Sequence, residues 1–401
     1  MTTSTPDSST EFEPLSDAFR NNVYGTLNEM RERCRAYRHK GTMQGVVSVF
    51  RHADVVEMAQ DWKTWSSDRG PEFKKSNLGD ATIIFYDDPP EHTRLRAVIA
   101  PLFLPANVQP LAHSIESRCD ELLDECFARG EFDLVEDLAS GLTIYMISKL
   151  LGLPEDAFSS IRHWAEVLEE NDGLAVFWPE RRPEVEQHIA ATCTEMSDYF
   201  RSFVEERKTE DKGDVMSAMV QGGFSDKQAS GLCQLLCIAG QATTTNLIAN
   251  VFRLLIENPH QARLVHEDSG YIDPLIEESL RLHSQIRKLE RIAKHDFEID
   301  GVEIKKGDFV ALWLASAKRD PRVIERPDEF DITRSKIRHL AFGTGIHMCI
   351  GNALARLETR ILLRRFFARV KEYGYAKGPE DVVYGANAAM DGIVRLPLRV
   401  Q

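Results

Sequence analysis

A glycine-punctuated loop near the C-terminus, carrying one cysteine, constrains this chain more than any other stretch. Residues 342–351 read FGTGIHMCIG, and apolar side chains follow at Ile350, Leu354, Leu357 and Ile361. This spacing predicts an amphipathic helix directly after Cys349. Unpaired N–H groups and the positive dipole end of a helix N-terminus favour a thiolate. We therefore expect the loop to present a thiolate, which suits an axial ligand of haem iron. The alternative is a buried structural cysteine beside a glycine turn.

The spacing Phe-Gly-x-Gly-x-His-x-Cys-x-Gly resembles the haem-binding loop of the cytochrome P-450 family, the haem-thiolate monooxygenases. The resemblance implies haem b (iron protoporphyrin IX) as cofactor and Cys349 as the metal ligand. It also implies a mainly α fold with small β-sheets, a triangular helical domain with haem between a long central helix and the cysteine-loop helix. Cofactor contacts implied by the resemblance are Cys349, His92, Arg96, Arg291, His347, Phe342, Gly343, Gly351 and Ala239.

A basic pair stands at the head of an earlier helical segment. His92 and Arg96 have i, i+4 spacing, which places them on one helix face. In the resembled family this pair binds the haem propionates together with His347 and Arg291, and charge-assisted contacts suit carboxylates. The alternative is an exposed basic helix start.

Composition and charge restrict the class of protein. The chain has 401 residues, is 43% apolar and 28% charged, and carries a net charge of −14. This charge argues against nucleic acid as a partner. The seven cysteines lack metal-ligand spacing and indicate reduced thiols in the cytoplasm. Residues 1–14 are polar and contain no apolar run of signal-peptide or membrane-anchor length, so we expect a disordered N-terminus and no membrane association. We expect one domain over residues 15–401.

A long helix is predicted from Ser225-Asp226, which can cap it, to about Glu257. At 1.5 Å per residue its roughly 32 residues span about 48 Å, enough to cross the molecule. A glycine and three threonines in its middle, residues 239–245, weaken the helical hydrogen bonding. The stretch either opens locally to hold water or dioxygen, or its threonines bond the preceding turn.

The resemblance assigns a role to this stretch and also exposes a departure. Thr243 matches the family's proton-delivering threonine, but Ala242 stands at the usual acid position. Gln241 and Thr244 are candidates for ordering a substitute water chain, so the candidate catalytic residues are Thr243, Gln241 and Thr244. The alanine keeps two alternatives open, a haem-thiolate nitric oxide reductase and a peroxide-driven oxygenase. A non-enzymatic haem sensor is a more distant alternative.

A second motif supplies structural residues. Glu278 and Arg281 have i, i+3 spacing for an ion pair and match the family's Glu-x-x-Arg. Glu329 stands where many members carry the third residue, an arginine, and Arg334 matches the alternative placement.

Candidate substrate contacts come from segments that the resemblance places around the haem. Arg287 and Lys288 either point outward or pair with Glu290, or one of them anchors a carboxylate or phenolate of the substrate. The full set is Leu235, Ile238, Ile286, Lys288, Leu289, Ala389 and Met390.

The expected reaction inserts one oxygen atom from dioxygen into a small organic substrate. Electrons are expected from a separate ferredoxin or flavodoxin docking over the cysteine face. The helix after Cys349 offers a basic patch for an acidic partner, or merely a solvated face, with Arg356, Arg360, Arg364 and Arg365.

Overall fold

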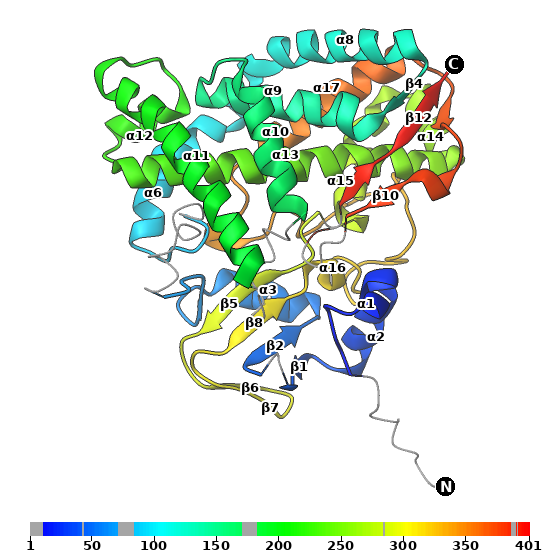
Figure 1. The fold of residues 1–401 in the computed structure, drawn as a ribbon. Coiled ribbons are helices and arrows are strands. Elements are labelled where there is room, and N and C mark those ends of the chain that lie inside the picture. Colours follow the sequence, from blue (N-terminus) through cyan, green and yellow to red (C-terminus); the bar gives the residue numbers. More distant parts are fainter. Residues whose placement is uncertain are drawn as a thin grey trace, which may run out of the picture.

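In the computed structural model the described residues are 11–41, 44–70, 84–170, 183–283, 285–385, 390 and 392–401. Most of the helices gather in one part of the molecule, with α13 crossing it, and the larger sheet lies beside α1, α2 and α3 (Figure 1). The α-helices are α1 Asp17–Asn21, α2 Val23–Arg33, α3 His52–Gln60, α6 Glu91–Ile99, α7 Pro105–Val108, α8 Ala112–Arg129, α9 Ser140–Leu151, α10 Ala157–Glu170, α11 Pro183–Thr209, α12 Val215–Gln221, α13 Asp226–Glu257, α14 Pro259–Glu267, α15 Ile272–Leu282, α16 Leu314–Ala317 and α17 Asn352–Arg369.

The strands form small sheets, so the prediction of a mainly α fold with small β-sheets is confirmed. The five-stranded sheet has the order β1-β2-β8-β5-β3, in which only β2 and β8 are parallel. Strand β12 lies between β4 and β9, while β10–β11 and β6–β7 are two-stranded. The strands are β1 Ala36–Arg38, β2 Val46–Val49, β3 Trp65–Ser66, β4 Glu131–Asp133, β5 Leu289–Ala293, β6 Phe297–Ile299, β7 Val302–Ile304, β8 Phe309–Leu312, β9 Tyr373–Tyr375, β10 Val383–Tyr384, β11 Ile393–Arg395 and β12 Pro397–Val400.

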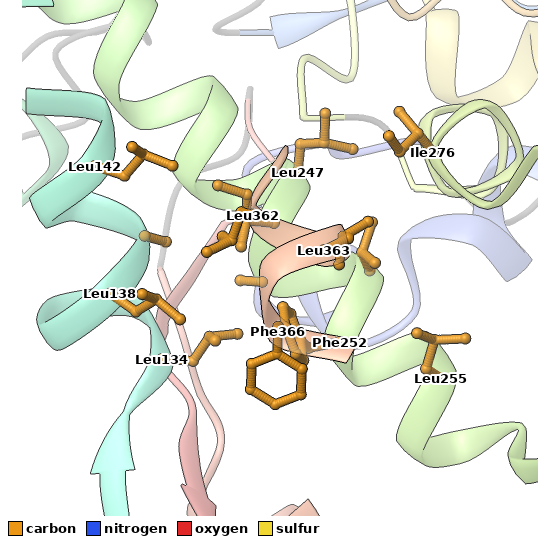
Figure 2. Close-up of a cluster of buried hydrophobic side chains, with 14 of the residues drawn as sticks. Leu134, Leu138, Leu142, Leu247, Phe252, Leu255, Ile276, Leu362, Leu363 and Phe366 are labelled. Atoms are coloured by element: carbon orange, nitrogen blue, oxygen red, sulfur yellow. The ribbon is translucent and has the colours of Figure 1, made fainter. Parts of the chain in front are cut away.

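Helix α13 is the central element, as predicted, and its 32 residues begin after a capping box in which Ser225 and Gln228 bond each other's backbone N–H groups. Its C-terminal half packs against α15, α17 and residues 134–142 in a dense apolar cluster (Figure 2). The rings of Phe252 and Phe366 meet edge to face there, with centroids 4.7 Å apart. The N-terminal half packs in a second cluster with α9, α10 and α11. By length and composition α13 could cross a membrane, but 72% of its apolar window is buried inside the molecule.

The N-terminal boundary differs from the prediction. Residues 1–10 lie outside the described residues, but Phe12, inside the predicted disordered segment, is only 2% exposed. Its ring contacts Phe19, Phe50 and Trp313 at centroid separations of 5.5–5.6 Å. Burial of this large apolar side chain outweighs the polarity of the residues around it, so the ordered chain begins before residue 15.

Candidate active site

The loop that carries Cys349 is held by its own backbone and by the end of α3. The Cys349 N–H donates to the Phe342 carbonyl at 2.8 Å, and the Asn352 side chain donates to the Cys349 carbonyl at 2.7 Å. Gly345 has φ +73°, and a Cβ there would lie 3.0 Å from backbone atoms of Ala59 and Gln60. The loop therefore needs glycine both for its backbone angle and for its close packing on α3.

The ionisation of Cys349 differs from the expectation based on a helix N-terminus alone. Its side chain is partly exposed, yet desolvation by the surrounding protein raises the pKa of the thiol. The Gly351 N–H and the guanidinium groups of Arg96 and Arg356 oppose this shift without reversing it. A metal ion bound to the sulfur adds positive charge and favours the thiolate.

Basic side chains converge beside the loop, as the resemblance implied. The rings of His92 and His347 lie 4.3 Å apart, and Arg96 donates to the Met348 carbonyl of the loop. Arg291 donates to the Glu290 carbonyl at 2.7 Å. Both ring nitrogens of His92, Nε2 of His347 and Nε of Arg291 are buried without a hydrogen-bond partner among the described residues.

The charges of this basic cluster, His92, Arg96, Arg291 and His347, are not balanced by ion pairs within the described part of the chain. Burial lowers the pKa of Arg291 to about 10. Burial, with the neighbouring Arg291, His92 and Arg96, lowers the pKa of His347 to about 2. Asp88 and Glu290 raise the pKa of Arg291, but burial outweighs them, and neither carboxylate forms an ion pair with the cluster. The propionates of haem b supply two carboxylates, so these residues fit that cofactor.

Helix α13 presents one open strip within an otherwise buried element. Leu235, Ile238, Ala239 and Thr243 are half-buried or exposed and follow helical spacing, whereas Gln241, Ala242 and Thr244 are buried. The predicted cofactor and substrate contacts on α13 are therefore among its accessible residues.

The threonine stretch is continuous α-helix, so the predicted local opening is absent from described α13. Thr243 Oγ1 donates to the Ala239 carbonyl at 2.7 Å, as the alternative interpretation had it. Gln241 lies two residues from Thr243, on the opposite helix face, and donates to Ser140 of α9 at 3.4 Å. The structure therefore does not bring Gln241 to Thr243, and Thr244 is buried away from the open strip.

The structural motif forms one buried network. Arg281 binds both Glu278 oxygens, at 2.7 and 2.8 Å, and Arg334 Nε donates to Glu278 at 3.0 Å. The structure thus brings Glu278, Arg281 and Arg334 together. The backbone carbonyl of Glu329, not its carboxylate, accepts from both arginines.

The residues proposed as substrate contacts have the following neighbours in the structure. Ile286 pairs with Met390 in an isolated β-bridge, and Leu289 lies 3.8 Å from where a Gly343 Cβ would stand. Ala389 lies outside the described residues. Lys288 binds Glu290, which also binds Arg69. This contact agrees with the alternative in which Lys288 pairs with Glu290.

Sequence reasoning missed the environment of the arginines on α17. Arg356 pairs with Glu277, Arg360 with Asp273 and Arg365 with Asp120, whereas exposed Arg364 has no ion pair with another described residue. The predicted basic patch is therefore mostly neutralised by carboxylates of α15 and α8. Glu277 was not singled out because its partners are distant in sequence.

Comparison with known proteins agrees with this geometry. The family model described as Cytochrome P450 matches residues 15–371. Cytochrome P450 109 of Bacillus spizizenii is 33% identical over 362 residues, covering 88% of this chain and 86% of the relative. Cytochrome P450 monooxygenase PikC of Streptomyces venezuelae is 34% identical over 321 residues, covering 78% and 74%. The crystal structure of P450BioI with a hexadec-9Z-enoic acid ligated acyl carrier protein has a TM-score of 0.88 at 27% identity, covering 96% of this chain and 99% of that one.

Proposed function

The chain belongs to the cytochrome P450 family of haem-dependent monooxygenases, and on this premise we propose which of its residues carry that reaction. When bound, haem b with a thiolate ligand supplies the redox chemistry that inserts one oxygen atom of dioxygen into a small organic substrate. Cys349 Sγ is the proposed iron ligand, and the basic cluster binds the propionates. The observation that carries this proposal is the set of buried His92, His347 and Arg291 nitrogens without hydrogen-bond partners among the described residues, beside the exposed Cys349.

Thr243 is the proposed proton-transfer residue. It lies on the open strip of α13, and its Oγ1, which donates to the Ala239 carbonyl, has lone pairs left to accept a hydrogen bond from a donor in the pocket. Buried Ala242 offers no titratable group beside it. We expect Thr243→Ala to lower the product formed per NADPH consumed several-fold. Equal product yield in both proteins would exclude Thr243 from proton transfer.

Ala242 also favours a second candidate function, a haem-thiolate nitric oxide reductase or a peroxide-driven oxygenase. An enzyme that needs no proton relay to dioxygen has no need of an acid at this position. Turnover with nitric oxide and reduced nicotinamide, or with peroxide alone, would identify these activities. Turnover that requires dioxygen and an electron-transfer protein would instead identify the monooxygenase.

The proposed electron donor is a ferredoxin or flavodoxin that docks on the face of the Cys349 loop in the cytoplasm. Arg356, Arg360 and Arg365 are already paired. Three exposed cations form no ion pair with described residues: Lys336 and Arg338, which precede the loop in the sequence, and Arg364 of α17. An acidic partner would be steered by these charges. Charge reversal of all three to Glu should slow electron transfer and weaken its salt dependence, and an unchanged rate would place docking elsewhere.

The proposed substrate is a small, mainly apolar molecule held by the open strip of α13 and the segment across from it. The lining residues proposed for it are Leu235, Ile238, Ile286, Leu289 and Met390, with Ala389 retained from the sequence. Substrate-induced change in the haem absorption spectrum is the measurement that ranks these contacts.

The decisive experiment is the carbon monoxide difference spectrum of the reduced, haem-loaded protein. A thiolate-ligated haem gives the red-shifted Soret band of the family, and Cys349→Ser should abolish it. Dioxygen-dependent turnover with a ferredoxin system then follows. A folded, haem-loaded protein without the thiolate band would overturn the assignment of Cys349.

A further inference from the structure

The carboxylate of Glu277 contacts residues on both sides of the Cys349 loop in the sequence. Glu277 of α15 accepts from Arg356 Nε at 2.6 Å and from Arg356 Nη2 at 2.9 Å. Its Oε2 also lies 3.0 Å from Nε2 of His339, which precedes the loop. Glu277 therefore contacts one residue before Cys349 in the sequence, His339, and one residue after it, Arg356.

The hydrogen bonds around His339 define which ring nitrogen faces the carboxylate. His339 Nδ1 accepts from the Ala341 N–H at 3.2 Å, so it carries no proton. Nε2 then bears the hydrogen and donates to Glu277. Burial lowers the pKa of His339 and favours this neutral form. The positive charge that Glu277 balances is thus the guanidinium of Arg356.

Arg356 links this carboxylate to the sulfur ligand. Its guanidinium lies 4.4 Å from the ring centroid of Phe342, the residue whose carbonyl accepts from the Cys349 N–H. Its Nη1 donates to the Asn352 side chain at 3.1 Å, and Asn352 donates to the Cys349 carbonyl. The guanidinium of Arg356 is thus placed against the loop that carries the sulfur, and a change in the net charge of Arg356 is felt there.

We propose that Glu277 is a positioning residue that fixes the Cys349 loop and neutralises Arg356, and thereby keeps the reduction potential of the haem low. This inference rests on the proposed ligation of iron by Cys349. An uncompensated cation beside the ligand would stabilise the electron-richer reduced state. With Glu277 ionised, Arg356 supports the loop without that electrostatic effect.

The test is a potentiometric titration of haem-loaded variants. Glu277→Gln keeps the side-chain shape and a hydrogen-bonding oxygen but removes the charge, so the potential should shift in the positive direction. Arg356→Gln leaves the carboxylate of Glu277 without its cation and should shift the reduction potential in the negative direction. The double variant Glu277→Gln/Arg356→Gln should return close to the wild-type potential. A purely structural role would move both single variants in the same direction, with loss of the thiolate band.

The same two helices provide a matched control. Asp273 of α15 pairs with Arg360 of α17, one turn further from Cys349 than Arg356, and no described contact joins that pair to the loop. Asp273→Asn also removes one carboxylate facing one arginine, and we expect a clearly smaller shift. A shift as large as that of Glu277→Gln would overturn the proposal, as would single variants that shift in one direction or a double variant that does not compensate. Wild-type protein without a thiolate band would instead overturn the assignment of Cys349.

Discussion

Two adjacent glutamates of α15, Glu277 and Glu278, hold different parts of the molecule at different depths. The Glu278 side chain is 0% exposed and pairs with Arg281, 1% exposed, and Arg334, 10% exposed. Glu277 and its partner Arg356 are 28% and 26% exposed. Buried ion pairs are costly to break because the remaining charge stays desolvated, whereas water screens exposed pairs. The same residue type therefore serves the fold at one position and adjusts a local charge at the next.

The partners of the two carboxylates differ in the same way. Besides Glu278, Arg281 and Arg334 donate to backbone carbonyls of residues 325–329, including Pro327 at 2.6 Å and Glu325 at 2.6 Å. The Asp331 N–H also donates to Glu278. This network orders an irregular segment by satisfying its backbone groups. Glu277 instead binds side chains on either side of the Cys349 loop, where a change in charge reaches the site.

Removing the buried carboxylate should have the largest effect. Glu278→Gln leaves two buried guanidinium groups without a counter-charge, and we expect the free energy of unfolding to fall by about 3–5 kcal/mol. Urea denaturation monitored by circular dichroism measures this loss. Glu277→Gln in the same experiment should lose only about 1–2 kcal/mol, because its pair is partly solvated. Equal losses would break the comparison between the two glutamates.

Packing against α3 is an anchor of the loop that is independent of both carboxylates. Gly345→Ala places a Cβ 3.0 Å from two backbone atoms at φ +73°, and backbone yields poorly. We expect a loss of about 2–3 kcal/mol in the free energy of unfolding, with weaker haem retention. Gly301→Ala is the matched control, because Gly301 has φ +79° and no atom within 4 Å of the added Cβ. It should lose only about 1 kcal/mol. If the two alanine variants lose the same amount, contact with α3 does not hold the loop.

Sequence reasoning was most successful where the signal is local in the chain. The cap of α13 at Ser225 and the glycine loop before α17 each depend on residues a few positions apart. The resemblance added Arg334, which composition and periodicity alone do not distinguish from other arginines.

The misses concern side chains whose partners lie on other elements. The arginines of α17 read as a basic patch because the carboxylates that neutralise Arg356, Arg360 and Arg365 come from α15 and α8. Gln241 was grouped with Thr243 by sequence proximity, although helical geometry turns residues two apart to opposite faces. Periodicity of 3.6 residues would have selected Ala239 and Thr243 without Gln241.

Acid should remove the contribution of Glu277, the smaller of the two glutamate contributions to the free energy of unfolding, over a pH range set by its pKa. Burial raises the pKa of Glu277, but hydrogen bonds from Arg356 and His339 and the charge of Arg356 outweigh it and bring the pKa to about 2. The unfolded chain has the ordinary value near 4.5 and so takes up a proton first as the pH falls. The stability given by the ionised carboxylate is therefore complete above about pH 4.5 and is lost as the pH falls toward 2.

The measurement is the difference in free energy of unfolding between wild type and Glu277→Gln, from urea titrations at several pH values. We expect the difference of about 1–2 kcal/mol at pH 7 to shrink to a few tenths by about pH 3. Because Gln does not titrate, other acidic groups cancel in the subtraction. A difference that stays constant across this range would mean that Glu277 contributes through shape alone, and the charge balance at Arg356 would then have no basis.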